Sequence, residues 1–171
     1  MASLKLPSQD RIRQLLDYDP DTGFFTWKIF RRWSAPVGGK AGHLNSKGYI
    51  KITIDSIEYQ AHRIAWKYMT GEDPIYQIDH IDGVKLNNRF SNLRQATNEE
   101  NQRNIGKQKN NTSGQKGVTY TKKKKKWMAR IGVKYKRIFI GEFEKFEDAV
   151  SAYKVAAKKY HGDYARDVHN D

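Results

Sequence analysis

The stretch from Ile78 to Asn101, IDHIDGVKLNNRFSNLRQATNEEN, constrains the fold of this chain more than any other segment. The short apolar and polar run from Tyr76 to His80 predicts a strand, residues 83–91 a loop, and residues 92–96 a second strand. Thr97 followed by Glu100 fits a capping box, which places the start of a helix there. Two strands and a helix would bring residues 79, 80 and 101 within reach of one another.

The residue types in this stretch suit the hydrolysis of a phosphodiester, which needs a base to activate water and a cation to stabilise the leaving oxygen. His80 is the candidate base, because the reference pKa of an imidazole is about 6.5. Asp79 and Asn101 offer oxygen ligands that suit Mg²⁺ and leave coordination positions for phosphate and water. Adjacent strand residues point to opposite faces, so Asp79 and His80 can serve one site only if the strand ends or twists there.

With AHR upstream at residues 61–63 and NNRFSNLRQAT in the loop and second strand, the segment resembles an HNH (ββα-metal) endonuclease of the phage-borne and homing type. The resemblance implies His80 as the general base, Asp79 as a metal ligand and Asn92 as the catalytic-motif residue that braces the loop behind the base. Asn101 occupies the last motif position, where many relatives have His. The implied cofactor is a divalent metal, Mg²⁺ or Mn²⁺.

Two further residues of the motif region have open roles. His62 begins the predicted helix and is either a hydrogen-bonded structural residue or part of the catalytic site. Arg63 is expected to contact phosphate or to pair with an acid. Arg89 in the loop and Arg94 in the second strand are candidates for contact with the DNA backbone.

The charge indicates a polyanionic partner, because 32 Lys+Arg against 19 Asp+Glu give a net charge of +13. Residues 106–171 are more basic than residues 1–105, so the C-terminal third is the expected electrostatic anchor. No apolar run is long enough to span a membrane, and the first ten residues lack the profile of a signal peptide. With no cysteines in the chain, we expect a protein of a reducing intracellular setting. The resemblance to phage-borne endonucleases implies the cytoplasm or nucleoid of an infected bacterial host.

Before the motif, local signals predict a small region of helix and strands. Ser8 is expected to cap a helix to Asp17, a turn follows at residues 19–23, and residues 24–29, 48–54 and 57–60 read as strands. A helix of about ten residues should start at Ala61 and stop at Gly71. Arg31, Arg32 and Trp33 lie in a loop that is either solvated or contacts phosphate while the ring stacks.

After a polar linker, the pattern predicts a second domain of three strands and a helix. The expected strands are residues 116–120, 127–133 and 137–143, with a turn of lysines between the first two. Alternation places Trp127, Ala129 and Ile131 on one face and Arg130 on the other, so one face is apolar and one basic. The apolar face should pack on a helix from about Phe146 to Tyr160 through Ala149, Ala152, Tyr153, Ala156 and Tyr160.

The segments GVTY, KWMARI, KRIFIGEF and EDAVSAYKVAAKKYHGDYAR resemble the ethylene-response-factor (Apetala-type) DNA-binding domain. In that family a three-stranded sheet lies in the major groove. The resemblance implies that the following residues contact DNA: Lys116, Thr119, Thr121, Lys123, Arg130, Arg137 and Phe139.

The sequence therefore predicts a two-domain α+β protein that binds and hydrolyses double-stranded DNA. Residues 1–105 form the HNH nuclease domain, residues 106–113 a linker, and residues 114–171 the DNA-binding domain with its antiparallel sheet packed on one helix. The enzyme is expected to be a monomer or weak dimer, without membrane association, and to nick one strand. Two alternatives stay open, namely a DNA-binding regulator with an inactive nuclease module and an RNA-processing nuclease.

Overall fold

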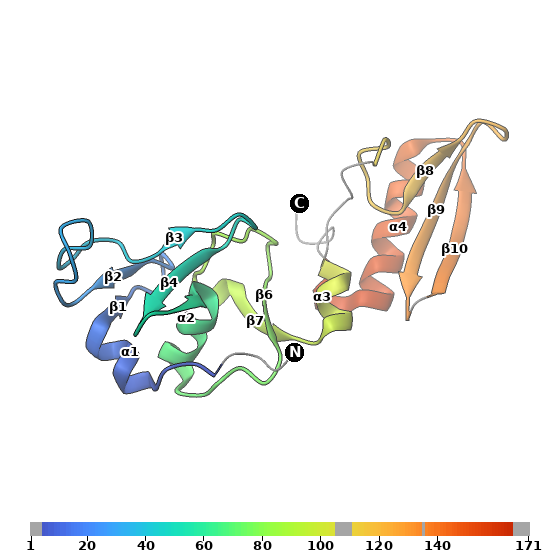
Figure 1. Cartoon of the computed structure of the whole chain (residues 1–171). Coiled ribbons are helices and arrows are strands. Elements are labelled where there is room, and N and C mark those ends of the chain that lie inside the picture. Colours follow the sequence, from blue (N-terminus) through green and yellow to red (C-terminus); the bar gives the residue numbers. More distant parts are fainter. Residues whose placement is uncertain (1–4, 105–110, 135, 166–171) are drawn as a thin grey trace. The chain divides into compact units, whose positions relative to one another are not determined.

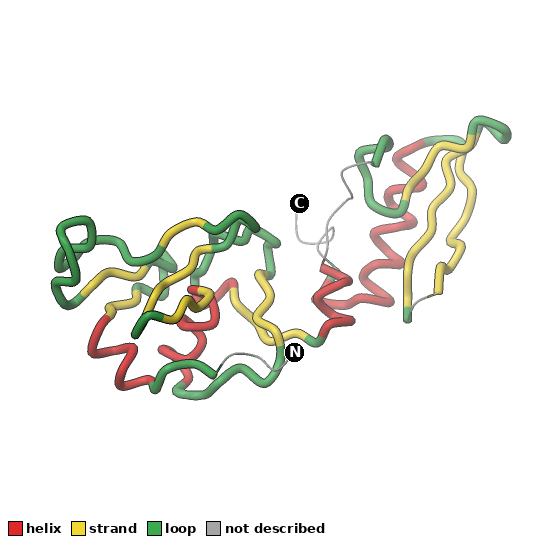
Figure 2. Tube along the Cα trace, viewed as in Figure 1, coloured by secondary structure: helices red, strands yellow, loops and turns green. Residues whose placement is uncertain are grey.

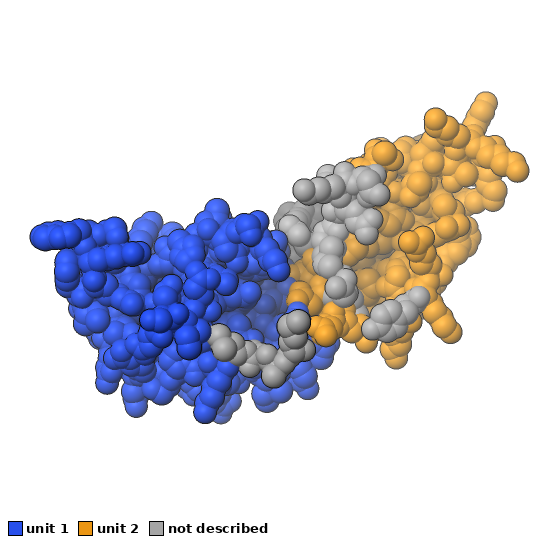
Figure 3. Space-filling model, in the orientation of Figure 1, with its two compact units in different colours: residues 1–97 blue, residues 98–171 orange. Residues whose placement is uncertain are grey.

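A computed structural model describes residues 5–104, 111–134 and 136–165, and the chain divides into two compact units, residues 1–97 (unit 1) and 98–171 (unit 2) (Figure 3). Most of the expected linker, residues 106–110, lies outside the described residues. The last part of it, Asn111 to Ser113, hydrogen-bonds within unit 2, where Ser113 Oγ donates to the Val118 carbonyl at 2.6 Å. The domain boundaries at residues 105 and 114 stay predictions.

Unit 1 contains two helices and three small antiparallel sheets (Figures 1 and 2). The sheets are β1–β2, β3–β4–β5 and β6–β7. In chain order the elements are α1 (Gln9–Leu15), β1 (Leu16–Tyr18), β2 (Phe25–Trp27), β3 (His43–Leu44), β4 (Ile50–Ile54), β5 (Ile57–Gln60), α2 (Ala61–Thr70), β6 (Gln77–His80), the short 3₁₀ helix η1 (Phe90–Asn92) and β7 (Leu93–Ala96).

Local signals set the ends of these elements as the sequence predicts. Ser8 caps α1, since its Oγ accepts from the Arg11 N–H at 3.2 Å. Gly71 ends α2 in the left-handed conformation at φ 78°, and its N–H donates to the Lys67 carbonyl. Asp55 and Ser56, with φ of 48° and 66°, form the two-residue turn of the β4–β5 hairpin.

One apolar core holds unit 1 together. Ile64 and Ala65 of α2 pack with Ile52 and Ile54 of β4 and with residues of α1 and the β1–β2 hairpin. Ile78 and Leu93, from β6 and β7, join the same core. The β6–β7 hairpin is therefore anchored on elements from the whole preceding part of unit 1, starting with α1.

Unit 2 begins with α3 (Asn98–Asn104) and continues with β8 (Val118–Thr121), β9 (Lys126–Val133), β10 (Lys136–Phe143), α4 (Phe146–His161) and η2 (Gly162–Tyr164). The strands form an antiparallel sheet in the order β10–β9–β8, and α4 packs on one face of it (Figure 1). Ala129 and Ile131 face α4, while their neighbour Arg130 is exposed on the opposite face.

The helix face differs from the expected one at its C-terminal end. Tyr160 is exposed, and Ala157 and His161 take the buried positions beyond Tyr153. A helix returns to the same face after four residues, so 153, 157 and 161 continue the buried stripe and Tyr160 falls beside it. His161 Nε2 lies 2.8 Å from the Gly132 carbonyl, which satisfies the buried imidazole. The prediction of Tyr160 as a core residue was wrong.

Candidate active site

The β6–β7 hairpin positions Asp79, the predicted metal ligand, and His80, the predicted general base, at the end of strand β6. Asp79 pairs with Arg94 in the ladder, and His80 pairs with Leu93. Both side chains are buried, with Asp79 7% and His80 4% exposed. The strand stops at His80, and the chain turns at once, where the Gly83 N–H donates to the His80 carbonyl.

The imidazole of His80 is held by Asn88, whose side-chain oxygen lies 2.9 Å from Nε2. An amide oxygen only accepts, so this contact favours the tautomer with a proton on Nε2. In that tautomer Nδ1 is the basic ring nitrogen. The contact fixes the orientation of the ring, as the role of a general base requires.

Asp79 makes a cross-strand ion pair with Arg94. Its Oδ2 accepts from Arg94 Nε at 3.0 Å and from Nη2 at 2.9 Å. Arg94 was expected to contact the DNA backbone, and the structure places it against the carboxylate of Asp79. The pair keeps a buried carboxylate compensated.

A network of hydrogen bonds among Asp82, Asn87 and Asn92 stabilises the loop that follows β6. Asn92 Nδ2 donates to Asp82 Oδ1 at 3.0 Å and to the Asn87 carbonyl at 2.8 Å, while its Oδ1 accepts from the Asp82 N–H. Asn87 Nδ2 donates to the other carboxylate oxygen of Asp82 at 2.7 Å. The sequence predicted that Asn92 braces the loop behind the base, and its side chain makes these contacts.

Burial raises the pKa of the Asp82 carboxyl, but hydrogen bonds from Asn87, the Val84 N–H and Asn92 outweigh burial and hold that pKa below its usual range. The anion therefore persists at neutral pH and keeps accepting the bonds that shape the loop.

Behind His80 lie Tyr49 and His62. The ring centroids of His62 and His80 are 5.1 Å apart in an edge-to-face arrangement, and Tyr49 lies 5.5 Å from His62. Burial, followed by the neighbouring His80 and Arg63, lowers the pKa of His62 to about 3. His62 is thus a neutral packing residue behind the base, and Arg63 is half-buried on the same helix.

The β1–β2 hairpin supports the active-site loop from the other side. The Tyr18 hydroxyl donates to the Asn88 carbonyl at 2.6 Å, and the Phe90 N–H donates to the Pro20 carbonyl at 3.0 Å. Gly23, at φ +77°, lies against the backbone of Asn88 and Arg89, where a Cβ would collide. Tyr18 and Gly23 support the loop through contacts distant in the chain, and for this reason sequence reasoning missed them. It also missed the contact of Asn88 with His80.

Comparison with known proteins identifies the family. A family model described as HNH endonuclease matches residues 59–103, which contain the β6–β7 hairpin and the loop. The chain is 34% identical to "Protein 3.8" of Escherichia phage T7 over 106 residues, covering 61% of this chain and 87% of that protein. It is 31% identical over 149 residues to "Uncharacterized HNH endonuclease L560" of Acanthamoeba polyphaga mimivirus, covering 84% of this chain and 74% of that protein.

This chain belongs to the HNH endonuclease family. It is an enzyme that hydrolyses DNA. No solved structure matches the chain.

HNH nucleases generally use a divalent metal, and the donors of this chain fit an oxygen-coordinated cation. The described residues contain no group of three or more His, Cys, Asp or Glu side chains that could hold a metal ion. Asp79 supplies a carboxylate directly before His80 in the chain. A cation bound by Asp79 would have few protein ligands, and phosphate and water would fill its other coordination positions. Asn101 lies on α3 in unit 2, and its pairing with Asp79 at one metal stays a prediction.

In the second unit of this HNH endonuclease, five of the seven predicted DNA contacts share one face of the sheet. Arg130 pairs with Phe139 in the ladder, and Thr119 and Thr121 pair with Met128 and Lys126 on the same outer face. Arg137 lies opposite Gly132. Lys123 is exposed in the turn between β8 and β9, and Lys116 is half-buried just before β8. A bulge between Phe139 and Gly141 shifts the register.

Within the described part of the chain, no helix is both long and apolar enough to cross a membrane.

Proposed function

We propose that this HNH endonuclease is a metal-dependent, homing-type enzyme that nicks duplex DNA as a monomer or weak dimer inside an infected bacterial cell. The observation that carries the proposal is the buried, oriented imidazole of His80, held at Nε2 by Asn88 beside the Asp79 carboxylate in the chain. The phage relative and the net charge of +13 support the setting and the partner.

In the proposed reaction a water molecule attacks the phosphorus in line with the 3′-oxygen. His80 takes the water proton at its basic ring nitrogen as the new phosphorus–oxygen bond forms and the bond to the 3′-oxygen breaks. Asp79 and Asn101 would hold a Mg²⁺ or Mn²⁺ ion, which when bound stabilises the negative charge on the leaving oxygen. Asn92 keeps the loop closed around Asp82 so that Asn88 stays against His80.

We further propose that unit 2 is an ethylene-response-factor-like module that delivers the nuclease to DNA. Its sheet has an apolar face on α4 and an exposed face with Arg130, Arg137 and Phe139. A three-stranded sheet with cations on its open face has the shape and charge to enter a major groove. Lys116, Thr119, Thr121 and Lys123 would contribute the remaining contacts.

The deciding experiment is incubation of supercoiled plasmid and host DNA with wild type and with His80→Ala, in Mg²⁺, Mn²⁺ or EDTA, with nicked and linear forms scored. We expect nicking by wild type alone and only with metal. Cutting by His80→Ala at the wild-type rate would exclude His80 as the base, and cutting in EDTA would exclude the metal. A regulator would bind DNA equally with or without metal and leave every substrate intact.

A further inference from the structure

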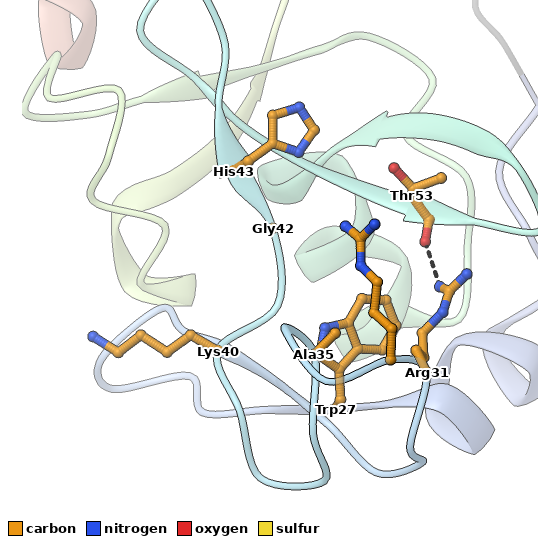
Figure 4. Close-up of a pocket in the computed structure, with 8 residues that line it drawn as sticks. Trp27, Arg31, Ala35, Lys40, Gly42, His43 and Thr53 are labelled. Atoms are coloured by element: carbon orange, nitrogen blue, oxygen red, sulfur yellow. Dashed lines mark hydrogen bonds between the residues drawn. The ribbon is translucent and has the colours of Figure 1, made fainter.

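A pocket of about 360 Å³ lies in unit 1, between the loop after β2 and the strands β3 and β4 (Figure 4). No step of the proposed reaction uses the residues that line it. These are Trp27, Arg31, Arg32, Ala35, Lys40, Gly42, His43 and Thr53. The lining contains cationic groups and no carboxylate.

Arg31 is held in place by neutral partners. Its Nη1 donates to the Thr53 carbonyl at 2.7 Å, drawn as the dashed line in Figure 4, and its guanidinium carbon lies 4.6 Å from the centre of the Trp27 ring. A guanidinium that is oriented by a carbonyl and an indole keeps its positive charge and its remaining N–H donors for a ligand.

Two carboxylates of unit 1, Asp55 and Glu58, are already paired with basic side chains. Asp55 accepts from Arg11 at 3.0 and 2.6 Å, and this contact is the main reason that the pKa of Asp55 lies below its usual range. Glu58 is 2.9 Å from Lys51 Nζ and 3.1 Å from His43 Nε2. The charge of Arg31 also helps to lower the pKa of Asp55, whereas Arg32 makes no ion pair within the described residues. The pocket therefore keeps a positive charge, which fits an anionic ligand.

Lys40 does not contribute its ammonium to this field. In Figure 4 its side chain points away from Arg31, and Nζ lies 4.1 Å from the centre of the Phe24 ring. The anion-binding groups are thus Arg31 and Arg32. In the described part of the chain, the Arg32 side chain makes no hydrogen bond or ion pair, so its role is not explained by folding.

Two exposed aromatic rings flank these arginines in the sequence. Trp33 is 93% and Phe30 57% exposed, and their ring centroids are 5.7 Å apart in an edge-to-face arrangement. Exposed aromatic rings beside guanidinium groups are typical of surfaces that bind the backbone and bases of nucleic acids. An indole so fully open to water gains from burial against a flat ligand.

We propose that this pocket binds a backbone phosphate of the DNA substrate through Arg31 and Arg32, while Trp33 and Phe30 pack against the adjoining nucleotide. The proposal rests on the DNA-cleaving function and adds a DNA contact within unit 1, separate from the sheet of unit 2. The bound group is a phosphodiester within DNA, and its recognition is independent of base sequence.

The test measures binding of the full chain to a labelled duplex in EDTA over a series of salt concentrations. Arg32→Gln removes the ligand contact without removing any described structural contact. We expect its affinity to fall by roughly 5-fold and the slope of log affinity against log salt to become less steep by about 0.9, the value for one lost phosphate contact. Lys5→Gln, which removes one positive charge from an exposed residue of unit 1 outside the pocket lining, is the control. Trp33→Ala should weaken binding with the slope unchanged, and thermal melts should show that each variant is folded.

Equal affinity and slope for Arg32→Gln and Lys5→Gln would overturn the proposal. The Arg130→Ala variant separates it from the function proposed for unit 2. Loss of binding in Arg130→Ala alone rejects the pocket and keeps the sheet, whereas loss in Arg32→Gln alone supports the pocket and rejects the sheet.

Inorganic phosphate at constant ionic strength should not remove the difference between wild type and Arg32→Gln. If it does, the pocket is a site for the free ion and the proposal fails.

Discussion

The hydroxyl of Tyr18 donates a hydrogen bond of 2.6 Å to the backbone carbonyl of Asn88, the residue whose side-chain oxygen meets His80. A residue of the first hairpin thereby fixes the position of the residue that contacts His80, the proposed base. The bond is buried, and burial raises the pKa of the Tyr18 phenol, which keeps the hydroxyl protonated as a donor.

Tyr18→Phe removes this donor and leaves the Asn88 carbonyl without it. We expect a loss of about 1–2 kcal/mol in the free energy of unfolding, measured by urea denaturation. We also expect a lower single-turnover nicking rate with unchanged duplex affinity in EDTA. Tyr59→Phe, at another buried tyrosine of unit 1, is the control. A nicking rate equal to wild type in Tyr18→Phe would show that the loop holds its position without this bond.

Asn88→Asp tests the link between position 88 and the base by its pH dependence. A carboxylate beside the imidazole favours protonated His80, and a protonated base is inactive. The acid limb of the nicking rate should therefore move to higher pH, whereas Asn88→Ala should lower the rate by about 10- to 100-fold, the usual effect of losing an orienting partner. An acid limb at the wild-type position in Asn88→Asp would separate Asn88 from the chemistry.

The burial of His62 predicts that the free energy of unfolding depends on pH. Because the folded state lowers the pKa of His62 to about 3, the unfolded chain binds a proton there at a higher pH than the folded chain does. The contribution of neutral His62 to stability is thus complete above the unfolded pKa of about 6.5 and is lost as the pH falls toward the folded value. Urea denaturation across this range should show a smaller fall in stability for His62→Gln than for wild type. Parallel curves would mean that other groups dominate acid unfolding.

Asp79→Ala should abolish metal-dependent cleavage while duplex affinity in EDTA stays nearly intact. The reason is that its carboxylate would serve the cation and not the contact with DNA. Asp73→Ala, which removes an exposed acid of unit 1 that pairs with Lys67, is the control for charge. Cleavage retained in Asp79→Ala, scored on supercoiled plasmid, would place the metal elsewhere.

Arg130→Ala tests the division of labour between the units. Arg130 lies exposed at the centre of the sheet, so its loss should weaken duplex binding while single-turnover cutting at saturating protein stays close to wild type. Lys158→Ala, on the exposed side of α4, removes a similar charge away from that face and should leave binding unchanged. Collapse of cutting at saturation would show that binding and cleavage are not separable.

Elements whose signals are local could be predicted from the sequence. The Ser8 cap, the Asp55–Ser56 turn and the stop at Gly71 each depend on residues within a few positions, and the structure confirms all three. The apolar and basic faces of the C-terminal sheet followed from alternation, which needs no knowledge of the fold.

Contacts that depend on long-range packing could not be predicted in this way. The pairing of Asp79 with Arg94 follows from the register of β6 against β7, and Tyr18 meets Asn88 only once two hairpins have docked. The strand β1 was expected to be the end of a helix, because the apolar Leu15 and Leu16 fit a helical stripe as well as a strand. Residues 16–18 form a strand because they pair with β2.

The close approach of Gly23 to the backbone of Asn88 and Arg89 has a consequence for engineering. The region that matches the family, residues 59–103, contains His80 and its loop, yet the loop rests on a turn that lies before this region in the chain. A fragment trimmed to the matched region would expose Ile78 and Leu93 and release the carbonyl that Tyr18 binds. The β6–β7 hairpin and its loop therefore cannot be transferred to another protein by themselves. The smallest transferable fragment has to include the β1–β2 hairpin.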